Sequence, residues 1–223
     1  MLQSSTLQFL RRLSRNNTKE WFDKHRPAYE SARADFAGFI SLLIDRHGRQ
    51  DPEIVVLQAK ECIFRINRDV RFSKDKSPYK NNMGASIKRD GKKSIFAGYY
   101  FHLQPGGESF AGGGLWMPGP AELGKVRQEI DYGLEEFKAI LTDKKFRAVY
   151  QGLDESAELK LIRSPKNYEE NNPAIEYLKL KSFITLTTFS DSELTDKGLT
   201  KKVLAAFSAI QPLLRFINRS IEN

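Results

Sequence analysis

The sequence has little of what several large classes of protein require. It holds one cysteine, Cys62, so no disulfide can form within the chain, and a reducing compartment is expected. No stretch approaches the roughly 20 consecutive apolar residues that cross a bilayer. The first residues lack the basic and apolar segments of a signal peptide, so we expect a cytoplasmic protein without a membrane span.

Sequence motifs of several enzyme classes are also missing. The chain has no HExxH, CxxC, GxSxG or P-loop pattern, which argues against zinc-dependent and serine-hydrolase chemistry. Three consecutive glycines, Gly112 to Gly114, do not form a nucleotide-binding loop, because no Lys-Ser/Thr pair follows them. No metal ligand is assigned from these motifs.

What the sequence does have is a concentration of positive charge between residues 65 and 80, called here the basic segment. Its sixteen residues include six cations and two carboxylates, namely Arg65, Arg68, Arg71, Lys74, Lys76, Lys80, Asp69 and Asp75. The resulting net charge of +4 is half of the formal charge of +8 of the whole chain. Cations at this density, interleaved with Phe72 and Tyr79, are typical of an anion-binding site.

The pattern of apolar residues predicts a single α+β domain over residues 1–223, with helices packed around a central, mostly antiparallel sheet. Helices are expected over the first fifty residues, from 121 to about 151, and from 203 to 221. Strands are expected at 54–57, 62–66, 83–87, 95–104, 109–116, 159–162 and 182–189. The basic segment would then leave the end of a strand as a long loop.

Two of the expected strands carry further information. Residues 95–104 alternate, so that Tyr99 and Phe101 lie on one face while Tyr100 and His102 lie on the other. The next strand contains the three glycines, which weaken a strand unless they serve a purpose. We expect a bulge, or the close approach of another backbone or of a ligand.

The basic segment also matches a known pattern. The run Arg65-x-x-Arg68-Asp69-x-Arg71-Phe72-x-x-x-Asp75-Lys76-x-x-Tyr79 resembles the signature of DUF2461, a bacterial family of uncharacterised proteins. The resemblance extends to Glu20-Trp21-Phe22, Gly98-Tyr99-Tyr100 with His102, Gly112 to Trp116, and Leu180 to Phe183. It implies kinship over the whole chain, but no activity, cofactor or catalytic residue.

The first functional hypothesis is a site for a phosphate-bearing ligand, either a nucleotide or a nucleic acid. The ligand-binding residues would be Arg65, Arg68, Arg71, Lys74, Lys76, Tyr79 and Lys80. Guanidinium groups bind phosphate oxygens in pairs, and lysines add point charge. Stacking surfaces for a base would come from Phe72, Tyr79, Tyr100 and Trp116.

A more ambitious version of this hypothesis adds phosphoryl chemistry. Asp69 and Asp75 would hold Mg²⁺, and His102 would act as a general base. The six-residue spacing of the two carboxylates neither supports nor excludes a shared metal. A neutral histidine packed in the sheet is the alternative role of His102.

The second hypothesis treats the chain as a non-catalytic structural or interaction module, with partners docking on its helices. The basic segment would then be an internal scaffold, held by ion pairs such as Arg68–Asp69 or Arg71–Asp75. Pairing both carboxylates would still leave four cations that must face solvent, acidic residues elsewhere, or a ligand. Both hypotheses stay open, as do the identity of any ligand, catalysis and the oligomeric state.

Overall fold

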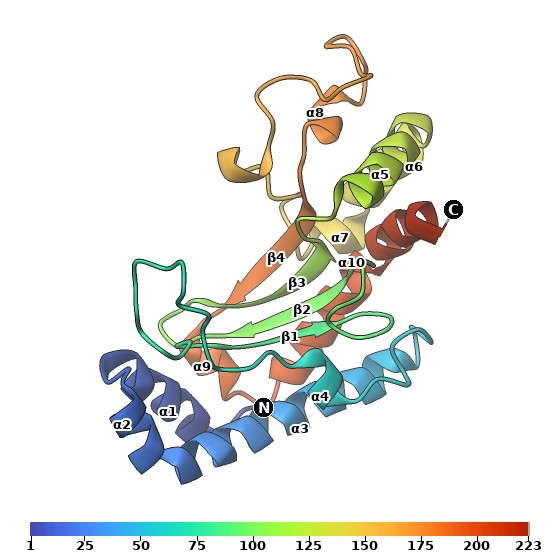
Figure 1. Ribbon diagram of the computed structural model, residues 1–223. Coiled ribbons are helices and arrows are strands. Elements are labelled where there is room, and N and C mark those ends of the chain that lie inside the picture. Colours follow the sequence, from blue (N-terminus) through green and yellow to red (C-terminus); the bar gives the residue numbers. More distant parts are fainter. Residues whose placement is uncertain (223) are drawn as a thin grey trace. The chain divides into compact units, whose positions relative to one another are not determined.

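Four strands form one sheet in the structure, a computed structural model that describes residues 1–222 (Figure 1). The strands are β1 (Met83–Ile87), β2 (Gly98–Leu103), β3 (Ser109–Leu115) and β4 (Phe183–Phe189). They pair in the order β1-β2-β3-β4, and the sheet is antiparallel. Together with the helices, this sheet confirms the predicted single-domain α+β class.

The described chain divides into two compact units, and β2, β3 and β4 each contribute residues to both. The first unit contains Met1–Lys92, Tyr100–Ala111 and Thr188–Leu204. The second contains Lys93–Tyr99, Gly112–Thr187 and the chain from Ala205 on. The predicted domain boundaries, 1–223, stay a prediction, and Asn223 lies outside the described residues.

The first unit begins with three helices whose apolar positions follow the predicted spacing. Its helices are α1 (Ser4–Arg15), α2 (Lys19–Lys24), α3 (Arg26–Gly48), α4 (Ala59–Cys62) and α9 (Asp191–Leu194). Leu7, Leu10 and Leu13 of α1 are buried, as expected for residues on one helical face. In α2 the side chain of Thr18 accepts a hydrogen bond from the amide of Trp21, which caps the helix and directs Phe22 into the core.

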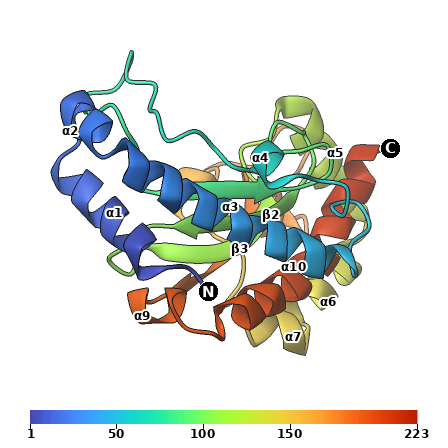
Figure 2. The same cartoon turned by 90° about the horizontal axis from the view of Figure 1, so that it is seen from below.

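Helix α3 lies across the face of the sheet that carries Phe101 (Figure 2). The rings of Phe36 and Phe39 have their centroids 6.1 Å and 5.1 Å from that of Phe101, which is fully buried. Because side chains alternate along a strand, Tyr100 and His102 lie on the opposite face, as predicted.

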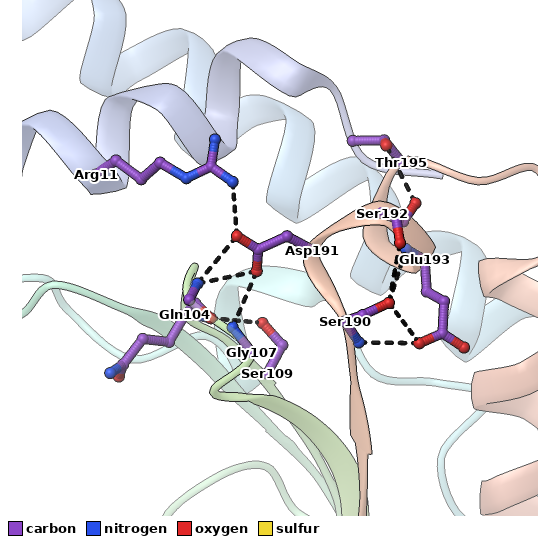
Figure 3. Close-up of polar contacts among 10 residues, drawn as sticks. Arg11, Gln104, Gly107, Ser109, Ser190, Asp191, Ser192, Glu193 and Thr195 are labelled. Carbon is purple, nitrogen blue, oxygen red and sulfur yellow. Dashed lines mark hydrogen bonds and ion pairs between the residues drawn. The ribbon is translucent and has the colours of Figure 1, made fainter.

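The turn between β2 and β3 is fixed by one carboxylate, that of Asp191 (Figure 3). It accepts hydrogen bonds from the amides of Gly106 (2.9 Å and 3.0 Å) and Gly107 (3.2 Å), and from Nη2 of Arg11 at 2.6 Å. Burial raises the pKa of Asp191, but these hydrogen bonds outweigh it and the net shift is downward. The turn is therefore tied to α1 and α9 within the first unit.

The second unit is mainly helical. Its elements are α5 (Pro120–Tyr132), α6 (Leu134–Thr142), α7 (Lys144–Arg147), the 3₁₀ turn η1 (Ala157–Leu159), α8 (Ile175–Leu178) and most of α10 (Leu199–Glu222). Phe137 packs against Phe216 at 5.3 Å and against Tyr177 at 5.1 Å between ring centroids. None of the described helices is both long and apolar enough to cross a membrane.

The three glycines of β3 are explained by their neighbours in the sheet. A Cβ atom on Gly112 would lie 2.0 Å from the carbonyl oxygen of Thr185, and one on Gly114 would lie 2.0 Å from that of Phe183. On the other side, a Cβ on Gly113 would lie 2.2 Å from the carbonyl oxygen of Gly98. Of the predicted alternatives, the close approach of another backbone is therefore present on both sides of β3.

Three of the expected strands are wrong. Residues 54–57 form turns in which Val55 and Val56 are exposed, so this apolar run does not pair with the sheet. A capping box between Gln58 and Glu61 starts α4, which takes up Cys62. Residues 62–66 and 159–162 contribute only isolated bridges, from Ile63 to Ala85 of β1 and from Lys160 to Leu180.

Candidate functional site

The basic segment leaves the protein surface and returns to it beside its starting point. Two backbone hydrogen bonds close its base, from Arg68 N to Pro78 O (2.9 Å) and from Lys80 N to Ile66 O (2.8 Å), and together they form the bridge between Asn67 and Tyr79. The residues between these contacts form a loop with few apolar anchors. The charged side chains therefore project from a loop whose two ends are fixed.

Tyr79 anchors the end of this loop instead of lining its surface. Its ring is 7% exposed and stacks on Phe22 with centroids 4.0 Å apart. The side chain of Asn17 accepts from the Tyr79 amide at 3.0 Å and donates to the Tyr79 carbonyl at 2.8 Å. A buried ring in this position cannot stack on a base, so we leave Tyr79 out of the ligand contacts.

Both carboxylates of the basic segment are paired within it, although the partners differ from those expected. Asp75 accepts from Arg68, and Asp69 accepts two hydrogen bonds from the guanidinium of Arg71, at 3.0 Å and 2.7 Å, and one from its amide at 3.3 Å. Hydrogen bonds from Ser77 and from Arg68 lower the pKa of Asp75 to about 2, and those from Arg71 lower the pKa of Asp69. The expected pairs were Arg68–Asp69 and Arg71–Asp75, so each arginine binds the carboxylate that was expected for the other.

The two carboxylates that the sequence suggested as joint ligands of Mg²⁺ both have an arginine partner. Each one is held by a different arginine, and an arginine beside a carboxylate competes with a cation for it. Within residues 1–222, no group of three or more His, Cys, Asp or Glu side chains could hold a metal ion. The role of Asp69 and Asp75 as ligands of Mg²⁺ stays a prediction.

The two paired arginines have different surroundings. Arg68 is 24% exposed, and it also donates to the carbonyl of Ser77 (3.2 Å) and the hydroxyl of Ser73 (3.3 Å), which join the two sides of the loop. Arg71 is 75% exposed, and its ion pair reaches only two residues back along the chain. Arg68 is therefore the scaffold arginine of the loop, and Arg71 is a surface residue.

We expect Arg68→Ala to lower the melting temperature by about 2–4 °C, the shift that one lost half-buried interaction gives in a chain of this length. Arg71→Ala should leave it unchanged within about 1 °C, because exposed ion pairs contribute little. Differential scanning calorimetry of the two variants measures both shifts. An equal loss in both variants would contradict the assignment of Arg68 as the scaffold residue.

The other four cations of the basic segment make no ion pair with any carboxylate in the described residues. Arg65, Lys74 and Lys76 are exposed, and Lys76 donates to the carbonyl of Val70 at 3.0 Å. Lys80 is half-buried, with Nζ 5.5 Å from the ring centroid of Phe64. Burial and the charge of Arg65 lower the pKa of Lys80, as expected for a cation without a counter-charge.

His102 belongs to a hydrogen-bonded row on the face of the sheet away from α3. Its Nε2 lies 3.1 Å from Oε1 of Gln104, and its Nδ1 lies 3.5 Å from the hydroxyl of Tyr100. Since Gln104 Oε1 can only accept, Nε2 carries the proton and Nδ1 accepts from Tyr100. Burial lowers the pKa of His102. The imidazole is therefore neutral at pH 7, and no carboxylate among the described residues is hydrogen-bonded to it as in an acid–base dyad.

The structure adds two aromatic residues that the sequence did not single out. Phe110 of β3 stacks on His102, with centroids 4.7 Å apart and planes 8° from parallel. Phe64, which directly precedes the basic segment, contacts Tyr100 at 6.3 Å. In the sequence, Gly106 and Gly107 indicate a turn before Phe110. They do not show which residue of β2 lies opposite Phe110, and only the pairing register of β2 and β3 places it beside His102. Of the other proposed stacking residues, Phe72 and Trp116 are exposed.

Comparison with known protein families gives one result. The model of a family described as "Conserved hypothetical protein (DUF2461)" matches residues 5–216. No curated protein and no solved structure gives a significant match. The match spans nearly all of the described chain, including the basic segment and the row of His102.

Proposed function

Because the chain belongs to the DUF2461 family, whose description names no activity, we propose a function from the site itself: the basic segment binds a phosphate-bearing ligand, a nucleotide or a nucleic acid. One observation carries the proposal. The two carboxylates of the segment form ion pairs with Arg68 and Arg71, and the other four cations have no carboxylate partner among the described residues. A multiply charged anion would relieve their mutual repulsion.

The shape of the segment supports the same proposal. Its base is closed by backbone contacts, so the cations project from one loop whose two ends are fixed. Phe72 is 95% exposed, with the guanidinium of Arg71 5.8 Å from its ring centroid. An exposed ring beside exposed cations is a favourable surface for a nucleotide, which presents a flat base next to a phosphate. The proposal is confined to binding.

The alternative function, a non-catalytic interaction module, is favoured by a different observation. Arg68 connects Asp75, Ser73 and Ser77 across the loop, so part of the charge does serve as scaffold. In this alternative the four unpaired cations are solvated and bind nothing. The two functions differ in what removal of an exposed cation should do to ligand binding.

A thermal-shift panel tests the proposal. Wild-type protein would be heated with sulfate, phosphate, nucleotides and short DNA and RNA, with and without Mg²⁺. At a ligand concentration about 100-fold above Kd, binding should raise the melting temperature by about 5–10 °C. Lys74→Ala should reduce the shift, whereas Lys201→Ala should not, because it removes an exposed lysine of α10 that makes no ion pair with a carboxylate of residues 1–222. No shift with any phosphate compound would favour the interaction module.

We also propose that the protein works in the cytoplasm. The single cysteine, Cys62, is buried, and burial together with the charge of Glu61 raises the pKa of its thiol to about 11. Such a thiol stays protonated and packs as a small apolar side chain. The chain thus has no disulfide chemistry that would require an oxidising compartment.

A further inference from the structure

We propose that the ligand is single-stranded nucleic acid, whose bases stack on the sheet while its phosphates contact the basic segment. The stacking surface consists of Phe64, Tyr100, His102 and Phe110, called here the aromatic face. The inference rests on the proposed function, since it specifies the ligand of the same site. It adds a second group of residues, on β2, β3 and the residue before the basic segment, that would recognise bases.

The four rings of the aromatic face form a continuous surface within the first unit. Tyr100 is the central ring, with its centroid 6.3 Å from that of Phe64, 5.7 Å from that of Phe110 and 6.1 Å from that of His102. Gly84 of β1 leaves room for it, because a Cβ there would lie 2.4 Å from the Tyr100 hydroxyl oxygen. The position of the Tyr100 ring is thus fixed by a glycine on one side and by His102 on the other.

The aromatic face is accessible, in contrast to the opposite face of the same strands. Phe101 and Leu103 are fully buried beneath the helical layer, whereas Tyr100, His102 and Phe110 are half-buried and Phe64 is 38% exposed. Aromatic rings that only build a core are covered by a second layer. Partly open rings in the middle of a sheet are the arrangement on which unpaired bases stack.

Positive charge lies beside these rings. Lys80 has its ammonium 5.5 Å from the Phe64 centroid. Arg65 follows Phe64 in the chain and acts on the charge of Lys80. A base on the aromatic face would therefore place its phosphate near Lys80 and Arg65, and the strand could continue along the exposed cations Lys74 and Lys76.

Polar groups border the rings as well. The amide of Asn82 donates to Oε1 of Gln104 at 3.3 Å, and Gln104 also accepts from His102. Both side chains are half-buried, and each keeps an amide group that can pair with a base edge. A duplex hides the faces of its bases in the stack, and a mononucleotide offers only one base to several rings. The combination of several rings with several cations therefore favours a single strand over either.

Fluorescence anisotropy with a labelled thymidine oligomer of about 12 nucleotides, and with an abasic oligomer of the same length, tests the inference. Wild-type protein should bind the thymidine oligomer more tightly than the abasic one. Phe110→Ala and Phe64→Ala should each weaken binding of the thymidine oligomer by about 5- to 150-fold, the loss expected for one stacked base, and leave the abasic oligomer unaffected. Tyr132→Ala, which removes an 81% exposed ring of α5, is the matched control and should change neither affinity.

The outcomes separate the inference from the proposed function. Equal binding of the two oligomers, with no effect of either phenylalanine, would overturn the aromatic face as a base platform and leave phosphate binding by the basic segment intact. Tighter binding of a duplex or of a mononucleotide than of the oligomer would also overturn it. Failure of every phosphate compound to bind, nucleotides as well as oligomers, would overturn both. Circular dichroism establishes that each variant is folded. If Phe110→Ala does not fold, Phe64→Ala, which changes a more exposed ring, still tests the inference.

Discussion

Replacing Gly114 by alanine should destabilise the protein by more than about 3 kcal/mol, or prevent folding. The new Cβ would lie 2.0 Å from the carbonyl oxygen of Phe183 and 2.8 Å from Cα of Ile184, both of which are backbone atoms of β4. The φ angle of Gly114 is +125°, which an L side chain rarely adopts. Neither the strand nor its neighbour can move without breaking the sheet. Urea unfolding followed by circular dichroism measures the loss.

Gly124→Ala is the matched control for this prediction. Gly124 lies inside α5, and a Cβ at that position meets no heavy atom within 4 Å. Alanine should therefore stabilise the protein by about 0.5–1 kcal/mol through its higher helix propensity. A Gly114→Ala protein as stable as wild type would contradict the close approach of β3 and β4.

Removing the four unpaired cations together should weaken binding of a single-stranded oligonucleotide by about 100-fold or more at about 0.05 M salt. The variant carries alanine at Arg65, Lys74, Lys76 and Lys80. Each cation that contacts a phosphate releases condensed counterions, so the losses multiply. The fold should be retained, because none of the four makes an ion pair in the described part of the chain and Arg68 stays in place. Fluorescence anisotropy measures the affinity.

The control for this variant removes four exposed lysines elsewhere: Lys93, Lys144, Lys145 and Lys201. It lowers the net charge of the chain by the same amount. If binding depends only on net charge, both variants should lose the same affinity. A loss confined to the first variant would locate the site on the basic segment.

Much of the fold could be predicted because burial in this chain follows simple periodicities. The alternation in residues 95–104 correctly separated the buried Phe101 from the half-buried Tyr100 and His102. The prediction failed for Ile54 to Leu57, where β-branched residues suggested a strand. Only Ile54 is buried there, and the following capping box diverts the chain into α4. Propensity alone does not say whether a partner strand exists.

The site was predictable in its charge but not in its contacts. Charge counting showed that two carboxylates could not neutralise six cations, and the structure pairs both carboxylates within the segment. The pair Arg68–Asp75 joins residues seven apart, which depends on how the loop folds back through the turn from Val70 to Ser73. Likewise, the contact of Phe110 with His102 depends on the register of a hairpin. Neither loop closure nor register is encoded in a local pattern.

The salt dependence of binding tests the central claim most directly. The observed binding constant of a single-stranded oligonucleotide would be measured between about 0.05 and 0.2 M salt, for wild type and for the variant without the four unpaired cations. If these cations contact phosphates, the slope of log K against log salt should be steeper in wild type by about 3, since each contact on a single strand contributes about 0.7. Equal slopes in the two proteins would contradict the claim, because the basic segment would then carry its charge without touching a phosphate.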